Sequence, residues 1–252
     1  MAGGSSPNYT CPQKVDDGTS CRADTPPPQP LGLCAVTTST YGNSDWGYSD
    51  VLVWKVLPTW IGGDPDHLRN YKDAWVRTHR GLIVKLSAQY GLPPELLAGV
   101  TWIEAGGKPY SSKLVLYRFR QFAHMADPML GPTEITQKPG LTSTGAVAIQ
   151  LRRAAQTMGV DFDGLSENDK DRLVDCLQVD ENDLAIVARH LWQLKQIDFA
   201  DQSKIGVDEI RIIGARYNRG PDLSLDEIYR NTSYGDFIVN RIYSRLQSLL
   251  GD

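Results

Sequence analysis

The chain has 252 residues, of which 41% are apolar and 22% are charged, and its formal net charge is −4. This composition excludes a wholly disordered chain and supports a substantial core. The apolar runs, such as residues 51–54, fall far short of the ~20 residues of a membrane span. The negative charge argues against a broad basic surface for nucleic acid. We therefore predict neither a membrane span nor a nucleic-acid partner.

The first 45 residues differ in composition from the rest of the chain. They hold six of the fifteen prolines, among them Pro26 to Pro28, with many Ser, Thr and Gly residues. Such a segment does not readily form helix or a core of its own. We predict an extended proline-rich arm over residues 1–45 and one domain over residues 46–252. The first thirteen residues lack the basic start and apolar stretch of a secretory signal peptide, so we expect synthesis in the cytoplasm.

The four cysteines form no CxxC pair, and no histidine lies near them in the sequence; they are Cys11, Cys21, Cys34 and Cys176. This spacing argues against a zinc site. Two interpretations stay open, which are free thiols in a reducing compartment or disulfide pairing in an oxidising one.

Helical periodicity dominates the chain from Trp46 onward. The apolar spacing predicts a helix over residues 66–90, which Gly91 and the prolines after it end. A second helix begins at Pro94 and ends at the glycine pair 106–107. Alternating side chains over residues 113–122 predict a strand, which residues 134–138 could join in a small hairpin.

Further helices are predicted in the second half of the chain. Their expected ranges are residues 146–158, a helix from Ser166 with Asp169 as a capping partner, a long helix after Asp180, residues 207–217 and residues 234–250. No internal repeat of 20–50 residues is visible. The predicted class is mainly α with a minor β element.

Glu104 is the first candidate for chemistry. It ends a helix that is almost entirely apolar from Leu96 to Ile103. Burial and the negative end of the helix dipole both disfavour the charged carboxylate. A carboxyl group whose pKa is raised in this way can hold a proton near neutral pH, as a general acid must.

Two later segments carry candidate binding residues. Ser143 to Gln150 combines small residues, which let a chain approach a ligand closely, with the donors and acceptors of the Gln150 amide. The second segment, residues 213–220, ends a helix in Tyr217 and Asn218, whose polar groups could reach a cleft.

Taken in this order, the three segments resemble those of the lysozyme-like superfamily of peptidoglycan glycosidases, notably soluble lytic transglycosylases and goose-type lysozymes. Residues 102–107 are similar to the family's helix that ends in the catalytic glutamate. Residues 143–150 and 215–220 are similar to its Ser-x-Gly-Ala…Gln and Ala-x-Tyr-Asn-x-Gly segments. Residues 231–250 resemble its closing helix.

This resemblance implies a lysozyme-like helical domain that cleaves the β-1,4 bond between N-acetylmuramic acid (MurNAc) and N-acetylglucosamine (GlcNAc). It implies Glu104 as the catalytic acid and Ser143, Gln150, Tyr217 and Asn218 as substrate-binding residues. It implies no cofactor, and the histidines show no spacing typical of a metal site.

The chain also departs from the family's pattern. Ala148 and Ile149 precede Gln150 where the family has a Gly-Leu-Met run, and about forty residues separate Glu104 from Gly145. Residues 143–155, 189–191 and 217–222 look more like lysozyme-like domains of bacterial antagonism proteins, including type VI secretion effectors. That likeness implies a toxin delivered to the periplasm of a target bacterium. An immunity protein and, through the arm, a secretion-machine component would then be partners.

The alternatives are a phage endolysin and a catalytically inactive module that only binds glycan or serves as a structural part. A conventional glycosidase needs a second carboxylate at a defined separation from the acid. The candidates Asp127, Glu134 and Asp222 are each more typical of a solvated surface charge. The resemblance implies a different route, in which the substrate's own N-acetyl group assists.

Overall fold

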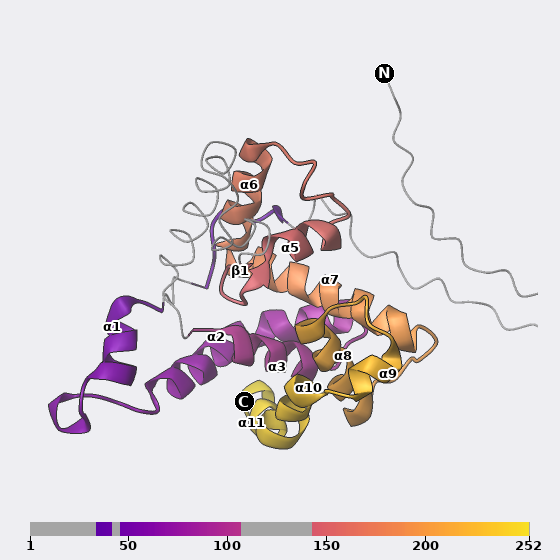
Figure 1. The fold of residues 1–252 in the computed structure, drawn as a ribbon. Helices are drawn as coiled ribbons and strands as arrows, with labels where there is room; N and C mark the ends of the chain where they lie inside the picture. The colour runs from indigo at the N-terminus through magenta and orange to yellow at the C-terminus, as the bar shows by residue number, and fades with distance from the viewer. Residues whose placement is uncertain (1–33, 42–45, 107–142, 252) are drawn as a thin grey trace, which may run out of the picture.

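The computed structural model describes residues 34–41, 46–106 and 143–251 (Figure 1). The described chain is mainly helical with one two-stranded antiparallel hairpin, which confirms the predicted class. The hairpin expected over residues 113–122 and 134–138 lies outside the described residues. The observed hairpin instead joins β1 (Ser143–Thr144) to β2 (Ile149–Gln150), with Ser143 opposite Gln150.

The helices follow one another in chain order with short connections. In the first half they are α1 (Tyr48–Val51), the π-helix η2 (Leu52–Val56), the 3-10 helix η3 (Thr59–Ile61), α2 (His67–Tyr90) and α3 (Pro94–Glu104). In the second half they are α5 (Leu151–Thr157), α6 (Glu167–Leu177), α7 (Asp180–Phe199), α8 (Val207–Arg219), α9 (Leu225–Tyr229), α10 (Ser233–Phe237), the π-helix η5 (Ile238–Ile242) and α11 (Tyr243–Gly251).

Helix α7 lies at the centre of the molecule and contacts α2, α3, α5, α6 and α8 (Figure 1). Its buried positions run round most of the helix, from Leu184 to Leu194, so both sides of the fold share one core. In Figure 1, α5 and α6 lie on one side of α7, and α8 to α11 gather on the other. The site described below forms where these two groups meet.

Several helix ends lie where the sequence predicts them. Gly91 takes the left-handed conformation (φ 58°) that ends α2, and Ser166 accepts a hydrogen bond from the backbone of Asp169 at the start of α6. The helix predicted over residues 146–158 begins only at Leu151, because residues 146–150 form the hairpin turn and β2. The helix predicted over residues 234–250 is interrupted by the π-helical turn η5.

Residues 34–41, the end of the predicted arm, pack against α6 and α7. A disulfide joins Cys34 to Cys176 in α6, and the Asn182 side chain exchanges hydrogen bonds with the backbone of Val36. Tyr41 lies 4.6 Å from the ring of His79. For these two cysteines, disulfide pairing is therefore the interpretation that holds. Cys11 and Cys21 lie outside the described residues.

No described helix combines the length and the apolar composition that crossing a lipid bilayer requires.

Candidate active site

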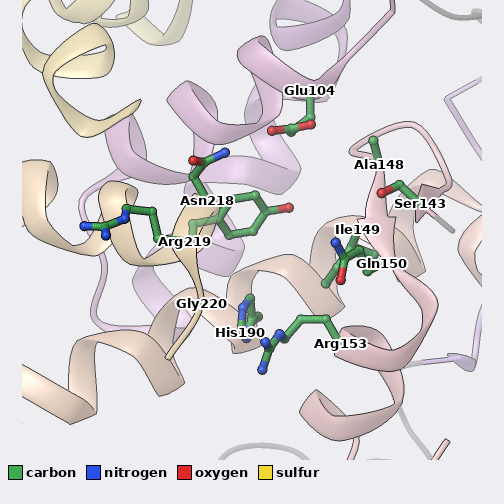
Figure 2. Close-up of a pocket in the computed structure, with 11 residues that line it drawn as sticks. Glu104, Ser143, Ala148, Ile149, Gln150, Arg153, His190, Asn218, Arg219 and Gly220 are labelled. Carbon is green, nitrogen blue, oxygen red and sulfur yellow. The ribbon is translucent and has the colours of Figure 1, made fainter. Parts of the chain in front are cut away.

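A cavity of about 250 Å³ opens between the end of α3, the hairpin, α5, α7 and the end of α8 (Figure 2). Its lining includes all five residues predicted from the sequence, namely Glu104, Ser143, Gln150, Tyr217 and Asn218. The other lining residues are Ala148, Ile149, Arg153, His190, Arg219 and Gly220. Segments up to 116 residues apart in the chain thus meet at one place, since Glu104 and Gly220 both line it.

Glu104 is the last residue of α3, and contacts from α2 hold that end of the helix. The ammonium group of Lys72 donates to the carbonyl oxygens of Trp102 and Ile103, which have no partner within the helix. The indole nitrogen of Trp102 donates to Asp73 Oδ1 at 2.8 Å. These bonds fix the last turn of α3 and therefore the position of the Glu104 carboxyl group.

Asp73, the residue that holds Trp102, is itself held in its charged form. Burial works to raise the pKa of Asp73, but hydrogen bonds from Arg245 and Trp102 lower it below its ordinary value. The carboxylate is only 5% exposed and is bonded on both oxygens by Arg245. Trp102 therefore supports the end of α3 through Asp73, and it is not among the residues that line the cavity.

The hairpin that carries Ser143 and Gln150 is held from α7. The carboxylate of Asp183, which is fully buried, accepts a hydrogen bond from the backbone of Val147 at 2.8 Å. Gly145 has φ +77°, and a Cβ atom there would lie 2.5 Å from an Asp183 oxygen. Only glycine fits this turn, so Gly145 allows the hairpin to approach α7 closely.

Glycines also bring α3 close to η5 and α8 close to α10. A Cβ atom at Gly99 would lie 2.7 Å from the side chain of Ile238, and one at Gly214 would lie 3.1 Å from the Cα of Gly235. Both are closer than ordinary contacts. Through this packing α8, α10 and η5 form one group against α3.

Tyr234 is a site residue that the sequence analysis did not single out. Its hydroxyl donates to Oε1 of Glu104 at 2.9 Å. Burial, then the nearby Glu104 and Tyr217, raises the pKa of Tyr234 well above its ordinary value. The hydroxyl therefore stays protonated and orients the carboxyl group. The signal for it was the likeness of residues 231–235 to the family's closing segment, but that likeness assigned it no role.

Tyr217 brings a second hydroxyl to the cavity, and this one has no hydrogen-bond partner among the described residues although it is buried. Its ring lies 6.0 Å from Tyr234 and 5.8 Å from His190. Burial, with Glu104 and Asp183 nearby, raises the pKa of Tyr217 well above its ordinary value. A buried, unsatisfied hydroxyl is costly, and one that lines a cavity is available to a ligand.

His190, which is buried in α7, is a further lining residue of the cavity, and the sequence analysis assigned it no role in the site. Burial, together with the positive charge of Arg153, lowers the pKa of His190 to about 3. The imidazole is therefore neutral near pH 7, so no imidazolium ion is present there to donate a proton. Figure 2 shows His190 beside Arg153, across the cavity from Glu104.

The two arginines that flank Asn218 hold the chain around it. Arg216 is buried and pairs with Asp198, and it also donates to the carbonyl oxygens of Pro221 and Leu223. Arg219 donates to the carbonyl oxygen of Glu227 at the end of α9. Asn218 itself is exposed at the rim of the cavity.

Among the described lining residues, Glu104 is the one carboxylate. Asp222 is exposed and does not line the cavity, while Asp127 and Glu134 lie outside the described residues. Within the described part of the chain, no group of three His, Cys, Asp or Glu residues is placed to hold a metal ion.

No family model, curated protein or solved structure matches this chain.

For the glycan substrate that the resemblance implies, we expect Tyr217→Phe to lower turnover about ten- to a hundredfold and to leave stability unchanged or slightly higher. The ring keeps its packing, and the lost hydroxyl has no partner in the free protein. A bond from this hydroxyl to a charged group formed in the transition state is worth roughly 1.5–3 kcal/mol. Steady-state rates and thermal melts of both proteins check this. Unchanged turnover would remove Tyr217 from the site.

Proposed function

We propose that this protein is a glycosidase that cleaves the MurNAc–GlcNAc β-1,4 bond of peptidoglycan, as a lytic transglycosylase or a muramidase. The observation that carries the proposal is the convergence of Glu104, Ser143, Gln150, Tyr217 and Asn218 on one cavity. These five residues come from separate segments of the chain, and their positions in the sequence do not by themselves require them to lie close together.

Glu104 acts as the acid that protonates the bridging oxygen of the scissile bond. The bond has a poor leaving group, so protonation must accompany its cleavage. The hydrogen bond from Tyr234 holds one carboxyl oxygen of Glu104 in place at the edge of the cavity. Such fixed geometry is what a general acid requires.

The positive charge that develops at the sugar carbon needs a nucleophilic partner. Glu104 is the one carboxylate among the described lining residues, so the substrate's own N-acetyl oxygen takes that part. Glu104 then accepts a proton as a base, either from the sugar's own hydroxyl, which gives an anhydro product, or from water. Gln150, Tyr217 and Asn218 orient the sugar and its acetamido group.

The protein serves as an antibacterial toxin that reaches the periplasm of a target bacterium, with an immunity protein as its inhibitor and the arm as a docking segment for delivery. The disulfide between Cys34 and Cys176 supports an oxidising destination, because such bonds are rare in reducing compartments. A phage endolysin would share the chemistry but differ in its route of release.

Mass spectrometry of peptidoglycan digested with the purified protein tests the proposal. Soluble fragments with an anhydro end or a hydrolysed end, which differ by one water, support it and distinguish the two reactions. Intact glycan after prolonged incubation would contradict it and favour the inactive glycan-binding module.

A further inference from the structure

We infer that Arg153 recognises a carboxylate on the glycan and makes the site selective for the anionic muramyl polymer over neutral polymers of GlcNAc. This inference rests on the proposed function and adds a specificity-determining residue to it. Arg153 lies at the end of the cavity opposite Glu104 (Figure 2).

The charge of Arg153 is not neutralised by any carboxylate among the described residues. Its guanidinium donates to the side-chain oxygen of Gln156, a neutral group one turn further along α5, at 3.0 Å. The preceding residue, Arg152, by contrast has a carboxylate partner, since it pairs with Asp163 at 2.8 Å, and it does not line the cavity.

The groups around Arg153 leave this end of the cavity positive. His190 beside it is neutral, because burial and the charge of Arg153 lower the pKa of that imidazole to about 3. Arg219, the other cation in the lining, is engaged by backbone carbonyls at the end of α9. A half-buried guanidinium whose hydrogen-bond partner is a neutral amide favours a carboxylate ligand, because a carboxylate can accept charge-assisted hydrogen bonds from it.

The proposed substrate carries such a group. MurNAc differs from GlcNAc by a lactyl ether that ends in a carboxylate, and in native walls this carboxylate is joined to a peptide with carboxylates of its own. The lactyl carboxylate and the peptide carboxylate offer the same chemistry from two sources. A chitin strand has neither, so its sugars would place no anion against Arg153.

Binding measurements in a Glu104→Gln background test the inference without cleavage of the ligand. Three ligands are compared: a GlcNAc tetrasaccharide, an alternating GlcNAc–MurNAc tetrasaccharide without peptides, and the same tetrasaccharide with peptides. We expect about tenfold tighter binding of the anionic ligands. Arg153→Gln should abolish this preference, and the matched control Arg152→Gln should retain it. The lactyl carboxylate is free only in the tetrasaccharide without peptides, because the peptide converts it to an amide. Preference for that ligand alone therefore assigns the contact to the lactyl carboxylate, preference for the peptide-bearing ligand alone assigns it to a peptide carboxylate, and preference for both shows that Arg153 accepts either carboxylate.

Equal affinity for neutral and anionic glycans, or a preference that survives Arg153→Gln, would overturn the role of Arg153 and leave the proposed glycan site standing. Loss of the preference in both arginine variants would indicate a general effect of charge. This result would also overturn the proposed role of Arg153. Failure to bind any of the three glycans would overturn the proposed function, and with it this inference.

Discussion

Glu104→Gln is expected to lower the rate of peptidoglycan cleavage by about 10²–10⁴-fold, the usual contribution of a single general acid. The substitution is nearly isosteric and removes only the dissociable proton. The amide oxygen can still accept the hydrogen bond that Tyr234 donates to Oε1. The contacts of Lys72 and Asp73 with the end of α3 do not involve this side chain, so the fold should survive.

Loss of turbidity of purified walls, measured beside a thermal melt, checks this prediction. Glu95→Gln is the matched control, because Glu95 lies in the first turn of the same helix and does not line the cavity. It should keep full activity. Equal clearance by wild type and Glu104→Gln would show that Glu104 is not the acid. A melting temperature lowered by many degrees would show that it is structural.

Some residues of the site could be identified from sequence patterns, and others became evident only from the structure. The two groups differ in whether a local sequence signal marks them. Glu104, Tyr217 and Asn218 stand at helix ends, where local sequence signals are strong. Tyr234 and Arg153 also lie in the first turns of their helices, α10 and α5, but their roles depend on what they meet across the fold, which no local signal indicates. No local pattern distinguishes Arg153 from Arg152, although only Arg153 lines the cavity.

The hairpin shows a second limit of local patterns. Residues 146–150 have a composition that suits a helix, and the sequence predicts one there. The hydrogen bond from Val147 to the buried Asp183 and the left-handed turn at Gly145 favour the hairpin instead. Asp183 is 36 residues away along the chain, so this tertiary contact could not be read from the segment itself.

The pairing of Cys34 with Cys176 also could not be predicted from the sequence. Cys34 and Cys176 are 142 residues apart, and four cysteines allow several pairings. The pairing becomes evident only when residues 34–41 are seen against α6 and α7. Those residues also show that the end of the predicted arm makes specific contacts, through Val36 and Tyr41.

Cys34→Ala is expected to lower the free energy of unfolding by about 2–4 kcal/mol, the usual contribution of a disulfide. The bond closes a loop with a sequence separation of 142, and in the chain-entropy model so long a loop corresponds to about 5 kcal/mol. We expect the melting temperature to fall by roughly 5–15 °C, since 1 kcal/mol shifts it by about 2–4 °C for domains of similar size.

Thermal melts of Cys34→Ala, Cys176→Ala and the double variant separate the cross-link from the packing of each side chain. If the cross-link dominates, each single variant already loses it, and the double variant should melt close to both. Additive losses would mean that the two side chains act independently and that the bond contributes little.

Activity measured well below the melting temperature should change far less than stability does. The disulfide anchors residues 34–41 to α6, whereas the cavity is held by other contacts, such as the bond from Val147 to Asp183. The two meet at neighbouring positions of α7, because Asn182 holds Val36 and Asp183 holds the hairpin. If turnover of the cysteine variants at low temperature falls as severely as their stability, the cross-link also orders the hairpin and, through it, Ser143 and Gln150.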